Sequence, residues 1–148
     1  MDLVFICNAN NPTGRLIPGS DLDAICRAHP QTVFVIDESY LPFAPDPSAV
    51  TMIATDLPNV MVLNSMSKAF RIPGLRIGFV KAQPPIVERL AAFALPWSVN
   101  SLAQAAVQWL MTHPQPVDAF LAGQLEPPGR VAHHPGVDDI HRGAEVVG

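Results

Sequence analysis

The chain has 148 residues, of which 49% are hydrophobic and 15% are charged, and its net charge is −4. This length allows one globular domain with a substantial core, and the charge argues against a broad basic face for nucleic acid. No apolar run approaches the length of a membrane-spanning helix, and the residues after Met1 lack a basic segment and a cleavage-like site. We therefore expect neither a membrane span nor a targeting signal.

The N-terminal part of the chain predicts two buried strands with a helix between them. Residues 3–7, LVFIC, form a continuous apolar run that is typical of a strand buried on both faces. Residues 18–29 offer capping side chains at Ser20 and Asp21, followed by apolar positions at helical spacing. Residues 32–37, TVFVID, predict the second buried strand.

The central segments predict two further strands and two helices. The strands are residues 59–65 (NVMVLNS) and 75–80 (LRIGFV). The helices are residues 84–95, which open with two prolines, and residues 98–111, which open with a serine. The alternation of strands and helices predicts an α/β fold with a mostly parallel sheet flanked by helices.

The composition changes near residue 123, where Pro, Gly and His become abundant and apolar periodicity ends. We therefore predict a folded part, residues 1–122, and a mobile tail, residues 123–148. The histidines of this tail lie in the segment without apolar periodicity, so we predict no metal site. They are His133, His134 and His141.

The two cysteines, Cys7 and Cys26, share no metal-ligand or redox spacing. Two isolated cysteines in a chain of this size indicate buried thiols in a reducing compartment. We therefore predict a cytoplasmic protein.

A polar turn, NNPTG, follows the first predicted strand. Taken alone, it is typical of a turn initiated by proline. The functional alternative is that Asn11, held by Pro12, presents its amide to a ligand at the carboxyl end of the strand, where open α/β sheets bind ligands.

The segment VFVIDESY places Asp37 at the end of an apolar strand, with Tyr40 three residues later. Asp37 could simply cap a helix or a loop. A carboxylate at this position could also pair with the cationic ring nitrogen of a heteroaromatic ligand.

Lys68 and Arg76 lie in an unusually apolar segment. A surface lysine is the common alternative for Lys68, but its apolar flanks predict a desolvated amine near another cation, which is able to form imines. Arg76 requires an anion, which could be a structural carboxylate or a phosphate. Ser65 and Ser67 nearby favour phosphate.

Four segments, NNPTG, DESY, SMSK and GLRIG, occur in the order found in the fold-type I aminotransferases that depend on pyridoxal phosphate. The sequence resembles this family from Leu3 to about Phe120, as a partial large domain. SKAFRIPGLRIGF and LPWSVNSLAQAA resemble the branch that contains histidinol-phosphate aminotransferase and threonine-phosphate decarboxylase. The segment PWSVN favours the decarboxylase, an enzyme of cobalamin biosynthesis, and the aminotransferase is the alternative.

The resemblance implies a pyridoxal 5'-phosphate site. Lys68 would bind the cofactor covalently and carry the proton at the reacting carbon, and Asp37 would pair with the ring nitrogen. Asn11 and Tyr40 would hydrogen-bond the phenolic oxygen of the cofactor. The phosphate would be bound by Ser65, Ser67 and Arg76.

The resemblance also implies a small phosphorylated amino substrate and a homodimer. Family members are much longer chains, so this sequence resembles an internal part of one, and a non-catalytic truncated remnant is an alternative to an enzyme. A nucleotide-binding module is disfavoured because neither G-x-G-x-x-G nor G-x-x-x-x-G-K-[ST] occurs.

The predicted tail does not resemble the continuation of the family, which suggests a shifted reading frame. Resequencing the locus tests this hypothesis. An uninterrupted frame, with no family-like sequence in the next frame, would contradict it.

Overall fold

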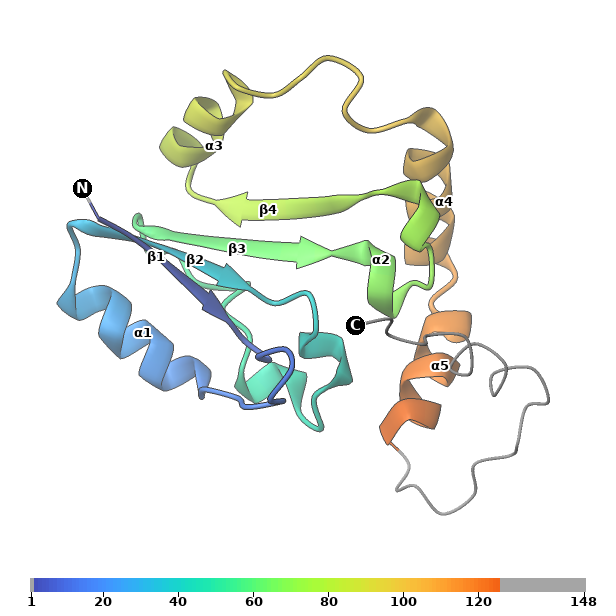
Figure 1. Ribbon diagram of the computed structural model, residues 1–148, viewed down its shortest axis with the longest axis horizontal. Coiled ribbons are helices and arrows are strands. Elements are labelled where there is room, and N and C mark those ends of the chain that lie inside the picture. Colours follow the sequence, from blue (N-terminus) through green and yellow to red (C-terminus); the bar gives the residue numbers. More distant parts are fainter. Residues whose placement is uncertain (1, 126–148) are drawn as a thin grey trace, which may run out of the picture.

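The computed structural model describes residues 2–125 (Figure 1). The four strands of this part are β1 (Asp2–Cys7), β2 (Thr32–Asp37), β3 (Val60–Ser65) and β4 (Gly78–Ala82). Its α-helices are α1 (Gly19–Ala28), α2 (Met66–Ala69), α3 (Pro84–Ala91), α4 (Ser101–Thr112) and α5 (Gln115–Leu125). Short 3-10 turns are η1 (Leu41–Phe43), η2 (Pro47–Ala49) and η3 (Pro73–Leu75).

The strands form one sheet in the order β1-β2-β3-β4. The pairs β1 with β2 and β2 with β3 are parallel, whereas β4 runs antiparallel to β3. Helix α1 connects the parallel pair β1 and β2 (Figure 1). The predicted α/β fold with a mostly parallel sheet is therefore confirmed.

The main core lies between α1 and one face of the sheet. Side chains alternate between the two faces of a strand, and the register places Phe34 beside Val60 and Ile36 beside Val62 on the α1 side. These four residues are almost fully buried, and Leu22 and Cys26 of α1 pack against them. The amphipathic pattern of residues 18–29 correctly predicted this helix.

The opposite face of the sheet is largely open at β1. Leu3 and Phe5 are 57% and 67% exposed, so the prediction that this strand is buried on both faces is wrong. Because β1 is an edge strand and α1 covers only one face, the other side chains face outward in the described part of the chain. Cys26 is buried as predicted, but Cys7 is exposed for the same reason.

Two helix starts differ from the sequence prediction. Helix α1 begins at Gly19 without a side-chain cap, and the Ser20 hydroxyl bonds the Asp21 carboxylate instead. Helix α4 begins at Ser101, later than predicted, because the side chain of Asn100 accepts a hydrogen bond of 2.8 Å from the Ala103 amide and caps it.

The last described helix, α5, was not predicted as a helix. It continues to Leu125, past the predicted boundary at residue 123, and the assignment of residues 123–148 to a separate tail stays a prediction. The histidines considered as metal ligands lie outside the described residues. Between residues 2 and 125, no helix is long and apolar enough to cross a membrane.

Candidate functional site

The residues predicted to carry function lie on the segments that follow β1, β2 and β3. Because these strands are parallel, their carboxyl ends lie side by side at the same end of the sheet. Five predicted residues line a cleft of about 330 Å³ at this end: Asp37, Ser65, Ser67, Lys68 and Arg76.

Asp37 ends β2 and reaches the cleft through the register of the sheet. It is paired with Cys7 of β1 and Leu63 of β3, and its side chain is half-buried. One carboxylate oxygen accepts a 2.9 Å hydrogen bond from the Ser39 amide. Asp37 therefore caps its own turn, as the structural alternative expected, and also presents a carboxylate to the cleft.

Lys68 lies in the short helix α2, directly after β3. Its neighbours Met66 and Ala69 are buried, and Lys68 itself is half-buried. The ammonium nitrogen is 5.2 Å from the centroid of the Tyr40 ring, which is within the range of a cation–π attraction. Lys68 thus has buried apolar neighbours and an aromatic ring as a close partner, but the cleft that it lines also contains polar side chains, and the desolvated amine stays a prediction.

The serines and Arg76 form the other side of the cleft. The Ser65 hydroxyl caps α2 by accepting a hydrogen bond of 3.3 Å from the Ser67 amide, and Ser67 is 8% exposed. Arg76 was predicted within a strand, but it precedes β4, with φ of 51° at the end of η3. This turn delays the strand to Gly78, so the guanidinium is exposed and donates to the Pro73 carbonyl at 3.1 Å.

Asn11 and Tyr40 line a neighbouring hollow of about 260 Å³. Asn11 is exposed in a tight turn, where Gly14 has φ of 66° and its amide donates to the Asn10 carbonyl at 2.7 Å. Tyr40 connects this hollow to the first cleft, since its ring lies against the Lys68 ammonium. The predicted residues are therefore gathered at one end of the sheet, in two adjoining hollows.

Two buried polar residues beside the site were not predicted from the sequence. Asn8 is 0% exposed, and its side-chain amide both donates to the Ile17 carbonyl at 2.9 Å and accepts from the Ile17 amide at 2.8 Å. Glu38 is 2% exposed, and burial raises the pKa of its carboxyl group. A polar residue directly after an apolar strand was the available signal in both cases.

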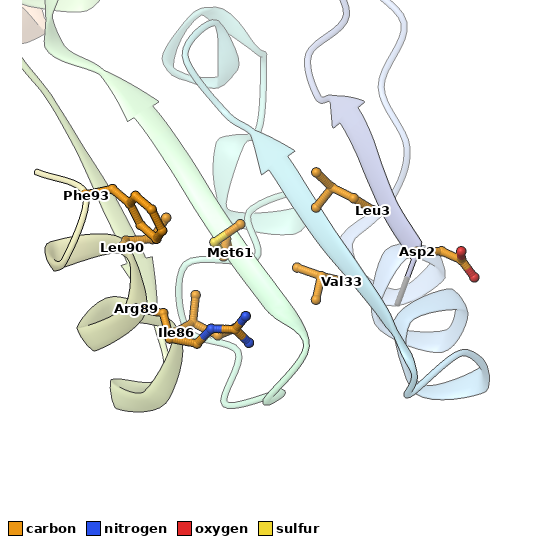
Figure 2. Close-up of a pocket in the computed structure, with 8 residues that line it drawn as sticks. All are labelled: Asp2, Leu3, Val33, Met61, Ile86, Arg89, Leu90 and Phe93. Carbon is orange, nitrogen blue, oxygen red and sulfur yellow. The ribbon is translucent and has the colours of Figure 1, made fainter.

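A second, apolar cleft of about 300 Å³ lies at the opposite end of the sheet (Figure 2). Leu3, Val33 and Met61 come from three adjacent strands, and Leu90 and Phe93 face them from α3 and the residues after it. Ligands of open α/β sheets bind at the carboxyl ends of the strands, and this cleft lies at the amino ends of β1 to β3. We therefore place the candidate site at the cleft that contains Lys68.

Comparison with known proteins identifies the family. A model of the family "Aminotransferase class I and II" matches residues 1–126. A histidinol-phosphate aminotransferase of Nocardia farcinica is 37% identical over 131 residues, which cover 88% of this chain and 34% of that protein. A histidinol-phosphate aminotransferase of Shewanella oneidensis is 38% identical over 109 residues, or 71% of this chain and 28% of that protein.

Solved structures agree with this fold. L-threonine-O-3-phosphate decarboxylase from Porphyromonas gingivalis matches with a TM-score of 0.72 and 40% identity, covering 77% of this chain and 35% of that one. Histidinol-phosphate aminotransferase from Sinorhizobium meliloti, in complex with pyridoxal-5'-phosphate, matches with a TM-score of 0.75 and 26% identity. The match covers 81% of this chain and 33% of that one.

The chain spans about a third of the length of the curated relatives it matches. The family match nevertheless extends over most of its residues and includes all four segments that carry the predicted site. The chain belongs to the class I and II aminotransferase family.

Proposed function

We propose that the chain is part of an enzyme that depends on pyridoxal phosphate and acts at the α-carbon of a phosphorylated amino compound. One observation carries this proposal: Asp37, Lys68 and Arg76, which have a carboxylate, an amine and a guanidinium, line a single cleft at the carboxyl ends of the parallel strands.

The side chains in the cleft have the chemistry that pyridoxal phosphate requires. When bound, this cofactor supplies an electron sink for the bonds at the substrate α-carbon. Lys68 provides the amine for covalent attachment and can move a proton at that carbon. The half-buried carboxylate of Asp37 can hold a proton on the ring nitrogen, because an opposite charge nearby favours the charged form.

The other predicted residues would fix the ends of the cofactor. Arg76 retains guanidinium N–H groups beyond the one that donates to Pro73, and these can bind phosphate together with the hydroxyls of Ser65 and Ser67. Asn11 and Tyr40, from the adjoining hollow, would donate hydrogen bonds to the phenolic oxygen.

Histidinol-phosphate aminotransfer is the reaction that we place first. The similar curated proteins named above are histidinol-phosphate aminotransferases, which supports this alternative over the decarboxylase that PWSVN favoured. Threonine-phosphate decarboxylation is the second candidate, because a decarboxylase structure is 40% identical. Incubation with histidinol phosphate or threonine phosphate distinguishes them, since only the second reaction releases carbon dioxide.

The quaternary structure and the cellular location are also proposals. Relatives in this branch act on phosphorylated substrates according to their names, and we extend this substrate class to the chain. We propose a homodimer and a cytoplasmic location for the enzyme. The competing proposal is a non-catalytic remnant, because the chain covers only about a third of its relatives.

Covalent labelling tests the assignment of Lys68 directly. The chain contains two lysines, Lys68 and Lys81, which makes the assay unambiguous. Lys81 donates to the Thr55 carbonyl and lies 3.8 Å from the Asp56 carboxylate, at the other end of the sheet. The purified chain would be incubated with pyridoxal phosphate, reduced with borohydride and digested for mass spectrometry.

We expect the label on Lys68 in the wild-type chain and in the Lys81→Ala variant, and its loss in the Lys68→Ala variant. Equal labelling of both lysines would contradict a preformed cofactor site at Lys68. Complete absence of label would favour the non-catalytic remnant.

A further inference from the structure

We propose that Glu38 is a positioning residue that holds the Tyr40 ring against the Lys68 ammonium. The proposal rests on the proposed function for its relevance to the cofactor, whereas the contact itself is a property of the chain without cofactor. Glu38 directly follows Asp37, the last residue of β2, but it does not line the cleft, and its carboxylate binds Thr51 and Met52 instead.

The carboxylate of Glu38 binds a distant segment of the chain. At 2% exposure, one oxygen accepts a 2.5 Å hydrogen bond from the Met52 amide, and the other accepts a 2.8 Å bond from the Thr51 hydroxyl. Met52 is itself a core residue, 4% exposed. Both carboxylate oxygens are therefore used to attach the end of the 39–52 loop to the end of β2.

The backbone of Glu38 attaches the start of the same loop. Its amide donates to the Leu63 carbonyl of β3 at 2.8 Å, and its carbonyl accepts from the Leu41 amide at 3.0 Å. Tyr40 lies within this turn, between Glu38 and Leu41. A single residue thus fixes both ends of the loop that carries Tyr40.

Tyr40 depends on this backbone support because its side chain is at the surface. It is 36% exposed, and its ring centroid lies 5.2 Å from the Lys68 ammonium and 6.3 Å from the centroid of the Phe43 ring. Phe43 belongs to the same loop. Removing the Glu38 carboxylate would leave the Met52 amide buried without its acceptor, and the loop would have to move to hydrate it.

Three variants distinguish the positioning of Tyr40 by Glu38 from an effect of the Glu38 charge and from an effect of any change in the 39–52 loop. Glu38→Ala removes both hydrogen bonds. Glu38→Gln keeps an acceptor for Met52 and offers a donor to the Thr51 oxygen. Asp46→Asn is the matched control, because Asp46 is an exposed carboxylate of the same loop that accepts from Ser48 and Ala49 and does not reach β2.

The readout uses the fact that Tyr40 is the only tyrosine of the chain. Incorporation of 3-fluorotyrosine into the full chain gives one ¹⁹F resonance, which reports the surroundings of this ring without any cofactor. We expect Glu38→Ala and Lys68→Ala to move the resonance by more than its linewidth. Glu38→Gln and Asp46→Asn should leave it within one linewidth.

An unchanged resonance in folded Glu38→Ala would overturn the proposal. If Glu38 had only a structural role, Glu38→Ala would lower the melting temperature of the chain but would leave the Tyr40 resonance of the folded state unchanged. If Glu38→Ala does not fold, Thr51→Val decides, since at nearly constant shape it removes the hydrogen bond from the Thr51 hydroxyl to Glu38, together with the bond that this hydroxyl accepts from the exposed Ile53 amide. A resonance that moves supports the proposal, and a resonance that stays overturns it.

Borohydride labelling of the same proteins separates this proposal from the proposed function. Failure of the wild-type chain to label at Lys68 would refute the cofactor site and leave the fluorine result to decide the role of Glu38. Labelling of the wild-type chain together with an unmoved Glu38→Ala resonance would refute the role of Glu38 alone.

Discussion

Asp37 and Glu38 are neighbouring carboxylates with different environments. Asp37 is half-buried in the cleft and accepts a hydrogen bond from the Ser39 amide, whereas Glu38 is buried and accepts hydrogen bonds from Thr51 and Met52. Burial raises the pKa of Glu38, and hydrogen bonds from Met52 and Thr51 oppose this shift without cancelling it. The last residue of β2 and the residue that follows it thus have different partners, the cleft for Asp37 and the 51–52 segment for Glu38.

This raised pKa predicts a pH dependence of stability. The ordinary pKa of 4.5 is raised in the folded state, so folding favours the protonated form. The resulting stabilisation is complete below about pH 4.5 and is lost as the pH rises through the folded-state pKa. Urea unfolding from about pH 4 to about pH 8 should show the wild-type chain losing stability relative to Glu38→Gln. A difference that does not vary with pH would refute the prediction.

At single residues, the sequence was informative where chemistry depends on residue type. Asp37, Ser65, Ser67, Lys68 and Arg76 were predicted from such chemistry, and they line one cleft. Asn8 and Glu38 were not identified, because their importance comes from partners distant in sequence. No local pattern links Glu38 to Met52 or Asn8 to Ile17.

At the scale of elements, β3, α2, η3 and β4 form a continuous unit around the cleft. The antiparallel register pairs Ser65 with Gly78, so the two ends of the connection that carries Lys68 and Arg76 meet. A Cβ atom on Gly78 would lie 2.6 Å from the Asn64 carbonyl oxygen. The close approach of the two backbones at this point requires glycine.

We predict that Gly78→Ala destabilises the chain by about 1 to 3 kcal/mol, since backbone must shift to admit the methyl group. The same variant should reduce labelling of Lys68, because the displaced strand carries Ser65. Gly74→Ala is the control, because a Cβ there has nothing within 4 Å. Urea unfolding measures the difference, and equal stability of the two variants would contradict the predicted close approach.

Elements with strong periodicity were predicted, and those set by tertiary contacts were not. Helix α5 contains Pro116 and lacks a clear apolar stripe, yet Phe120 packs edge-on against Phe43 at 6.1 Å and beside Arg71 at 5.0 Å. Strand β4 begins later than its apolar pattern suggested, because Arg76 adopts a left-handed conformation. An apolar run such as LVFIC occurs in edge strands as well as in central strands, so the sequence could not show that β1 has one exposed face.

At the scale of the whole molecule, one face of the sheet is apolar and accessible. Leu3 of β1 lines the apolar cleft with Met61, Leu90 and Phe93 (Figure 2). Phe5 of the same strand is 67% exposed. Contiguous apolar surface of this kind binds hydrophobic dyes and promotes association. Self-association of the chain should therefore increase with protein concentration.

We predict that the double substitution Leu3→Ser and Phe5→Ser lowers binding of the dye anilinonaphthalene sulfonate at least twofold and shifts the chain toward monomer. Stability should change by less than about 1 kcal/mol, because both side chains are mostly exposed. Ile25→Ser, at a 44% exposed position on α1, is the control and should have a smaller effect. Dye fluorescence and sedimentation measure both quantities, and unchanged dye binding would contradict the assignment of this face.

The sheet order has a kinetic consequence for the site. Pairing of β3 with β4 closes a short loop, whereas pairing of β1 with β2 and of β2 with β3 requires longer crossovers. Shorter loops cost less entropy to close, so the lysine side of the cleft forms through a local contact. The carboxylate side, with Asp37, depends on the non-local pairings of β2, so we expect this side to complete the cleft last.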